Sequence, residues 1–369
     1  MIPVFRPYTD GKEIEYLKEV IDSGWWGLGP KTKEFEEKFA KYVGVKYAVG
    51  LNSATAALDL AFRSIGIEEK EVITTSMTFV STNHAILYNK GIPIFCDIEP
   101  DTMNIDANKI EELVTDKTKA IIVVHYGGRA CDMDKVMDIA NRYNLQVVED
   151  CAHSSGGKYK NKMLGSIGDF GCFSFQAVKN LSTGDGGMLT TNNKDAYDFL
   201  MKYRWVGITK DTFSRDKGQY SWFYDVVNLG HKFHMNDITA AIGLAQFEKL
   251  EWMNNQREKW TNYYNEKLDG IGDIKIPTKK KYMKPAYHNY VIKIAQRDEL
   301  QEFLKAKDIS TGVHYYPNHL YDMYKPYYRE LPMTETIWKK LITLPLFPGM
   351  TKKEADFIID SIKEFYNFL

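Results

Sequence analysis

Short apolar stretches alternate with amphipathic helical stretches through roughly the first half of the chain. The period-two or fully apolar stretches predict strands at 47–51, 71–75, 92–97, 120–125, 146–150, 170–175 and 188–191. Helical spacing of apolar residues predicts helices at 56–65, 79–88, 107–114 and 133–143. Strands that alternate with helices form βαβ units, so we expect an α/β fold with a mostly parallel central sheet flanked by helices.

The flanking regions follow a different pattern. Residues 14–21 and 35–42 have the spacing of amphipathic helices, and the glycine-rich loop between them carries Trp25 and Trp26. These tryptophans could cover a ligand, close an interface or simply pack. Residues 235–253 predict one long helix with Asn236 or Asp237 as its cap.

Beyond the polar stretch 277–281, the pattern predicts further elements at 287–294, 297–307 and 310–316, and a last helix from Thr351. Thr351 and Glu354 have the spacing of a capping box. We therefore expect a large domain of residues 1–250 and a smaller C-terminal α+β domain of residues 251–369.

Composition narrows the functional classes. The chain has 369 residues and is 44% hydrophobic, enough for a sizeable core. A net charge of −1 argues against nucleic-acid or anionic-membrane partners. No apolar run has the length of a membrane span, and the N-terminal residues lack the features of a signal peptide, so we expect a cytoplasmic protein.

The cysteines do not indicate a metal or disulfide framework. Cys96, Cys131, Cys151 and Cys172 form no Cys-x-x-Cys pair, and most lie in or beside apolar strand-like runs. We interpret them as reduced, buried thiols. Because no group of histidines and cysteines has a known zinc spacing, we expect no metal site.

The loop between the strands at 170–175 and 188–191 carries Lys179 among mostly apolar neighbours. Loops at the rim of an open α/β sheet are where such folds bind ligands. An apolar environment lowers the pKa of an amine, and such a lysine can form a Schiff base with a carbonyl cofactor. A surface lysine without a role is the alternative.

Polar residues at two other strand ends complete a candidate site. Ser53, Ala54 and Thr55 begin a helix directly after a strand, which is typical of a phosphate site, although an ordinary helix cap is the alternative. Asp150 ends the apolar strand 146–150, where a carboxylate can pair with the ring nitrogen of a cofactor or simply be solvated. His153 is close enough in sequence to reach the same ligand.

Several longer motifs occur together in one order. Over nearly its whole length the chain resembles the sugar aminotransferases of the DegT/DnrJ/EryC1/StrS family. The matching stretches are Ser23–Glu36, Asn52–Leu58, Val124–Gly128, Glu149–Ser154, Phe173–Leu181, Gly184–Gly187, Val313–His319 and Leu344–Pro348. The resemblance implies an aspartate-aminotransferase-like fold (fold type I), pyridoxal 5′-phosphate (PLP) as cofactor and a homodimer with active sites shared between subunits.

The resemblance also assigns roles by matching position. Lys179 would hold the PLP aldehyde as a Schiff base, Asp150 would face the pyridine nitrogen, and Phe79 would stack on the ring. His153, where many relatives have Gln, would approach the ring hydroxyl. The residues expected around the phosphate are Ser53, Ala54, Thr55 and Ser174.

One stretch departs from the family pattern. Where relatives often have Gly-Tyr-Asn-Tyr-Arg-Met, this chain has residues 230–235 with Lys232 in place of Asn and His234 in place of Arg. In relatives the Asn reaches the phosphate of the partner subunit. Lysine is a good point-charge partner for phosphate, so we expect Lys232 to keep the role of a phosphate donor.

The resemblance indicates transamination from L-glutamate to a nucleotide-linked keto-deoxysugar, aminated at C3 or C4, for aminosugar and surface-polysaccharide biosynthesis. Trp26, His314, Tyr316 and His319 are candidate substrate contacts or packed residues. The identity of the sugar and the residue that binds the donor's carboxylate stay open. The alternatives are the same chemistry on a small ketone such as a keto-phosphate or inosose, and a non-catalytic PLP-binding regulator, which no basic patch or helix-turn-helix supports.

Overall fold

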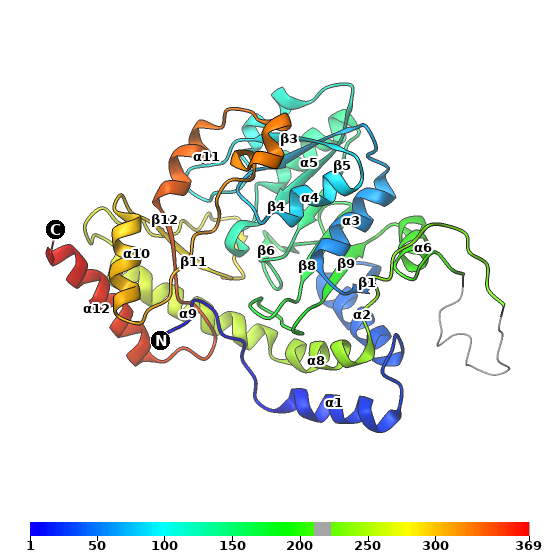
Figure 1. Ribbon diagram of the computed structural model, residues 1–369, viewed down its shortest axis with the longest axis horizontal. Coiled ribbons are helices and arrows are strands. Elements are labelled where there is room, and N and C mark those ends of the chain that lie inside the picture. Colours follow the sequence, from blue (N-terminus) through cyan, green and yellow to red (C-terminus); the bar gives the residue numbers. More distant parts are fainter. Residues whose placement is uncertain (210–222, 369) are drawn as a thin grey trace.

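A seven-stranded sheet forms the centre of the computed structural model, which describes residues 1–209 and 223–368 (Figure 1). Its strand order is β1-β9-β8-β5-β4-β2-β3. The strands are β1 (Tyr47–Leu51), β2 (Glu71–Thr75), β3 (Ile92–Cys96), β4 (Thr118–Val124), β5 (Gln146–Asp150), β8 (Phe170–Ser174) and β9 (Gly187–Thr191). Only β9 runs antiparallel to its neighbours β1 and β8, so the expected mostly parallel sheet is confirmed. The carboxyl ends of the other six strands therefore share one edge.

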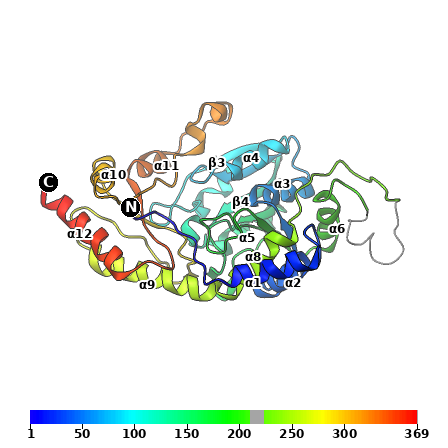
Figure 2. The same cartoon turned by 60° about the horizontal axis from the view of Figure 1, so that its bottom comes forward.

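Helices cover both faces of this sheet (Figure 2). One face packs on α2 (Pro30–Val43), α5 (Met133–Tyr143) and α8 (Asp237–Glu248), around the fully buried Phe35 and Phe39. The other face packs on α3 (Ala54–Ile65), α4 (Ser81–Tyr88) and α6 (Lys194–Tyr203). Because both faces are covered, the strands are apolar along most of their length rather than alternating. Helix α1 (Lys12–Ser23) lies outside, along α8.

A second hydrophobic cluster lies in the C-terminal part of the chain. It is built from β11 (Tyr290–Lys293), β12 (Leu341–Leu344), α9 (Leu250–Leu268), α10 (Arg297–Ala306) and α12 (Lys352–Phe368). Thr351 and Glu354 form the expected capping box at the start of α12, with side-chain to backbone bonds of 2.8 and 3.2 Å. The N-terminal segment also belongs here, because Ile2 pairs with residues 308–310 and the Val4 carbonyl accepts from the Leu346 N–H.

Short elements complete the described fold. They are β6 (Lys158–Tyr159), β7 (Lys162–Met163) and β10 (Met283–Lys284), which form a three-stranded sheet, and α11 (Pro332–Ile337). All four cysteines are buried and free, as expected. In the described part of the chain no helix combines the length and apolar character that a bilayer crossing requires.

Two helix predictions were wrong in detail. Residues 107–114 form two 3-10 turns instead of an α-helix, because the buried Ala107, Ile110 and Leu113 recur every three residues, the period of a 3-10 helix. The expected single helix at 235–253 is interrupted at Lys249, whose backbone is non-helical and whose ammonium group pairs with Asp10 and Glu13. Asn236 is the N-cap of α8, and its side chain accepts a 2.8 Å hydrogen bond from the Thr239 N–H.

A fully buried carboxylate beside the sheet ties down the segment that precedes β8. Glu149 accepts hydrogen bonds from the backbone N–H groups of Gly165, Ile167 and Gly168 at 2.7–2.9 Å and from His125 Nε2 at 3.0 Å. Burial alone would raise the pKa of Glu149, but these donors lower it below its usual value. The Cys151 thiol is also nearby, with its sulfur within 4.8 Å of ligand atoms of both residues. Because the carboxylate already has four donors, we interpret this cluster as structural.

We expect Glu149→Ala to destabilise the protein by about 4 kcal/mol, because it leaves three buried backbone N–H groups and one buried histidine N–H without an acceptor. The measurement is the urea midpoint of the cofactor-free protein. Glu68→Ala is the matched control, since Glu68 forms only an exposed pair with Lys90 and its loss should leave the midpoint unchanged. Equal midpoints for the two variants would contradict this role of Glu149.

Candidate active site

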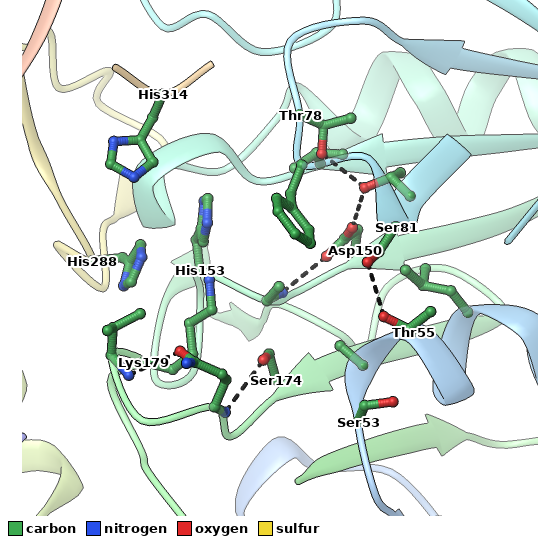
Figure 3. Close-up of a pocket in the computed structure, with 18 of the residues that line it drawn as sticks. Ser53, Thr55, Thr78, Ser81, Asp150, His153, Ser174, Lys179, His288 and His314 are labelled. Carbon is green, nitrogen blue, oxygen red and sulfur yellow. Dashed lines mark hydrogen bonds between the residues drawn. The ribbon is translucent and has the colours of Figure 1, made fainter. Parts of the chain in front are cut away.

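A cavity of about 470 Å³ opens at the carboxyl edge of the sheet. Its walls come from residues that follow β1, β2, β5 and β8, and from two segments of the C-terminal part near residues 288 and 314. Because parallel strands bring their carboxyl ends to one edge, residues from distant parts of the sequence converge there. Figure 3 shows the polar side chains that face this cavity.

The first wall is the start of α3. Ser53 is the N-cap of this helix, and its hydroxyl accepts a 3.1 Å bond from the Ala56 N–H. The Thr55 hydroxyl donates to Ser81 at 2.9 Å. Strand β9 comes so close that a Cβ on Gly187 would lie 2.4 Å from the Ser53 carbonyl carbon, so only glycine fits. The result is a helix N-terminus surrounded by hydroxyls, which is suited to an anion.

Asp150 lies at the end of β5 and is 4% exposed. One carboxylate oxygen accepts from the Thr82 hydroxyl at 2.8 Å and the other from the Ala152 N–H at 3.0 Å. Burial raises the pKa of Asp150, and these bonds together with the Lys179 charge only partly offset it. A cationic group in the cavity would therefore pair favourably with this carboxylate.

Lys179 follows β8 on a turn in which its N–H donates to the Gln176 carbonyl at 2.8 Å. Its side chain lines the cavity. Desolvation lowers the pKa of Lys179 to about 8, although Asp150 pulls in the opposite direction. About a tenth of this amine is therefore neutral and nucleophilic at pH 7, far more than for an ordinary lysine, and a neutral amine is what carbonyl chemistry needs.

Three histidines line the cavity near Lys179: His153, His288 and His314 (Figure 3). Burial lowers the pKa of His153 and of His288 well below 6.5 and that of His314 to about 4, and the nearby Lys179 charge adds to the effect. All three are neutral at physiological pH. This side of the cavity therefore offers uncharged hydrogen-bonding groups.

The cavity brings together eight of the residues singled out as cofactor contacts. They are Ser53, Ala54, Thr55, Phe79, Asp150, His153, Ser174 and Lys179. The ring of Phe79 is 59% exposed and lines the cavity, which leaves its face free for stacking. The candidate substrate contact His314 also lines the cavity, whereas Trp26, which is 53% exposed, lies outside it.

The other candidates lie elsewhere in the described chain. His319 is fully buried, and its ring nitrogens contact Ser76 at 2.6 Å and Glu335 at 3.2 Å, so the packed alternative fits it better than a substrate contact. Tyr316 packs against Tyr321 and Trp338. Lys232 places its amine over the Trp205 ring, 5.0 Å from the centroid, and does not line the cavity of its own chain.

Sequence reasoning missed several residues of the cavity, among them Phe5, Thr82, His288 and Tyr315. Thr82 had a usable signal, since the helix predicted at 79–88 puts it about one turn after Phe79 and so on the same face. Tyr315 stands inside a recognised motif, but the motif predicts no difference between it and the neighbouring Tyr316. Phe5 and His288 carried no local signal, because only the packing of the C-terminal part places them here.

The residues of this cavity fit PLP. The α3 terminus with Ser53, Thr55 and Ser174 provides donors for a phosphate. Asp150 is a buried carboxylate that a protonated ring nitrogen would complement, and Lys179 is an amine of lowered pKa for an aldehyde. The Asp150 carboxylate, the Lys179 amine and the candidate phosphate site at the start of α3 all border the same cavity.

Comparison with known proteins agrees with this assignment. A family model for the DegT/DnrJ/EryC1/StrS aminotransferase family matches residues 7–363. The chain is 37% identical to the spore coat polysaccharide biosynthesis protein SpsC of Bacillus subtilis (strain 168), covering 98% of this chain and 96% of that protein. It is 35% identical to the GDP-perosamine synthase of Escherichia coli O157:H7, covering 99% of each.

Among solved structures, the putative sugar aminotransferase Spr1654 from Streptococcus pneumoniae in its PMP-form superposes with a TM-score of 0.93 at 30% identity, covering 100% of both chains. The same protein has also been solved in a PLP-form. The expected aspartate-aminotransferase-like fold is thereby confirmed. The chain belongs to the DegT/DnrJ/EryC1/StrS aminotransferase family and is a PLP-dependent aminotransferase.

Proposed function

We propose that this enzyme transfers the amino group of L-glutamate to a nucleotide-linked keto-deoxysugar, at C3 or C4, for the biosynthesis of aminosugars of surface polysaccharides. The observation that carries the proposal is the convergence of Lys179, Asp150 and the α3 terminus on one cavity. The names of two relatives support a sugar as the amino-group acceptor, since one is a GDP-perosamine synthase and the other is a spore coat polysaccharide biosynthesis protein. The neutral histidines beside Lys179 are compatible with an acceptor that presents hydroxyl groups.

Each residue has a defined task in this proposal. When bound, PLP supplies an aldehyde that exchanges its oxygen for an amine and a protonated ring that takes up the electron pair of a broken Cα–H bond. Asp150 accepts the ring N–H and so keeps that nitrogen protonated. Lys179 would be placed to move a proton between the donor's Cα and the cofactor's C4′. Phe79, which lines the cavity, would cover one side of the ring.

The test is a half-reaction screen. The PLP-loaded enzyme is converted to its amine form with L-glutamate, which releases 2-oxoglutarate, and the change is followed by absorbance. Individual ketones are then offered, and the one that restores the aldehyde spectrum is the acceptor. Restoration by a keto-phosphate or an inosose instead of any nucleotide-linked ketosugar would overturn the proposed acceptor, and no response to glutamate would overturn the donor.

The lowered pKa of Lys179 predicts how cofactor capture depends on pH. Only the neutral amine attacks an aldehyde, so the rate should rise with pH through a midpoint of about 8, the pKa of Lys179, well below that of an ordinary lysine. Stopped-flow absorbance after mixing cofactor-free protein with PLP measures this rate. Asp150→Asn should move the midpoint to lower pH, because the carboxylate favours the charged ammonium. A midpoint above 10 in the unmodified protein would contradict the lowered pKa.

We also propose that the enzyme is a homodimer in which Lys232 reaches the phosphate bound by the partner subunit. The stretch around Lys232 lies close to the phosphate site of its own chain, since the Asn52 N–H donates to the Phe233 carbonyl at 2.7 Å. The phosphate carries nearly two negative charges, which a helix terminus and hydroxyls neutralise only in part. A lysine from the second subunit would supply the remaining charge.

Lys232→Ala should therefore weaken PLP binding, and mixing it with Lys179→Ala should restore activity at limiting PLP. In the mixed dimer one site combines its own Lys179 with Lys232 of the other subunit. Subunit exchange is checked with differently tagged chains, and mixing either variant with itself is the control. Inactive mixed dimers with proven exchange would rule out the shared site.

A further inference from the structure

The chemistry of PLP fixes which wall of the cavity faces its ring hydroxyl. On the pyridine ring, the hydroxyl and the phosphate arm flank the aldehyde on opposite sides, and the nitrogen lies opposite the aldehyde. With the aldehyde at Lys179, the nitrogen at Asp150 and the phosphate at α3, the hydroxyl must point away from Ser53 and Thr55. Figure 3 shows His153 and His288 across the cavity from those two residues.

His153 was expected to approach this hydroxyl, but its ring nitrogens are already engaged. Nδ1 accepts a bond from the Gly127 N–H at 3.3 Å, and Nε2 lies 2.9 Å from the Tyr315 hydroxyl. The ring is neutral and carries one proton, and Nδ1 is the acceptor, so the proton is on Nε2. His153 therefore donates to Tyr315.

This bond determines what Tyr315 can do. Burial raises the pKa of Tyr315 well above 10, so the phenol keeps its proton. Its oxygen accepts from His153, which leaves that proton free to be donated. Tyr315 lines the cavity, and within residues 1–209 and 223–368 its hydroxyl has no hydrogen-bond partner other than His153.

We propose that Tyr315, with its hydroxyl oriented by His153, donates the hydrogen bond to the ring oxygen of PLP, and that His153 is a positioning residue. The inference rests on the cofactor orientation of the proposed function.

A stack of nearly parallel rings holds His153 in place. His288 stacks on His153 with centroids 4.3 Å apart and planes at 17°, and Phe5 stacks on the other side of His288 at 5.0 Å and 10°. The backbone N–H of His288 donates to the Gly127 carbonyl at 3.2 Å. Gly127, whose own N–H bonds His153, therefore also holds His288 in place. Phe5 is anchored by the backbone pairing of Ile2 and Val4. The N-terminal segment thereby reaches the active site through Phe5.

The test uses the absorbance of the PLP-loaded enzyme as a function of pH. A hydrogen bond donated to the ring oxygen favours its charged form and lowers the pH midpoint of the chromophore. Tyr315→Phe should therefore raise this midpoint by about one pH unit. The other ionisable groups that line the cavity keep their side chains in that variant; they are Asp150, His153, Lys179, Asp185, His288 and His314. Tyr321→Phe makes the same chemical change on an exposed tyrosine outside the cavity and should leave the midpoint unchanged.

The stack is tested by a double variant. Phe5→Ala should raise the midpoint by a smaller amount, and in the Tyr315→Phe background it should add nothing, because Phe5 acts through the tyrosine hydroxyl. A merely structural role of Phe5 would lower the thermal midpoint in both backgrounds and leave the spectrum unmoved. An unchanged spectral midpoint in Tyr315→Phe, or additive shifts in the double variant, would overturn the inference.

Failure of the proposed function is distinguishable from failure of this inference. Borohydride reduction and peptide mapping of the unmodified enzyme must first place the pyridoxyl group on Lys179. A label on another lysine overturns the cofactor orientation itself, whereas a label on Lys179 with an unchanged Tyr315→Phe spectrum overturns only the role of Tyr315.

Discussion

Lys179→Ala should reduce turnover at least about 10⁴-fold while the protein stays folded. The variant removes both the amine that holds the cofactor and the base that moves the proton, and positioned general acid–base catalysis alone contributes about 10²–10⁴-fold. The Lys179 side chain lines the cavity and is not part of the hydrophobic core clusters, so the fold should tolerate alanine. Turnover with L-glutamate and the screened acceptor is the measurement, together with the thermal midpoint.

Two further variants make this prediction specific. Lys179→Arg keeps a positive charge but cannot condense with the aldehyde, and it should be as inactive as alanine. Lys162→Ala removes an exposed lysine on β7 and should leave turnover unchanged. A Lys179→Ala variant with more than a few per cent of wild-type turnover would show that another group performs the chemistry.

The position of the main candidate site residues was predictable because the sheet is mostly parallel. Strand ends are readable from apolar stretches, and in such a sheet they meet at one edge. Asp150 ends β5, Lys179 follows β8 and Ser53 follows β1, so each lies where a strand-end rule places it. The arrangement needed no knowledge of side-chain contacts.

Of three features that sequence patterns missed, one has a local cause and two depend on contacts between distant segments. Residues 107–114 contain enough apolar residues for an α-helix, but these residues recur every three positions, which favours 3-10 turns. The break at Lys249 follows from acidic partners more than 200 residues earlier in the chain. The placing of Phe5 beside His288 requires the N-terminal segment to pair with residues 308–310, which no local pattern indicates.

The same limit explains the choice between Tyr315 and Tyr316. Successive residues of an extended segment point to opposite sides, and nothing in the motif says which side is the cavity. Tyr315 faces His153, whereas Tyr316 faces Trp338. Motif membership located the segment but could not resolve which of its side chains faces the cavity.

Asp150→Asn should lower turnover about 10³-fold while PLP still binds. The amide has the shape of the carboxylate but cannot hold a proton on the ring nitrogen electrostatically, and removing one preorganised electrostatic contact costs about 10²–10³-fold in kcat. The protonated ring is what accepts the electrons of the broken Cα–H bond, so the loss should appear in kcat more than in the Kd for PLP. Single-turnover absorbance with L-glutamate measures this step.

A variant that weakens the hydrogen bonding of the Asp150 carboxylate without removing it should lose less turnover than Asp150→Asn. Thr82→Val removes the hydroxyl that donates to Asp150 at 2.8 Å, which raises the pKa of the carboxyl further but leaves the group in place. Its rate loss should therefore be about tenfold, well short of that of Asp150→Asn. If instead Asp150→Asn turned over at the wild-type rate, the ring nitrogen would have no need of this carboxylate, and the orientation of the cofactor in the cavity would have to be reversed.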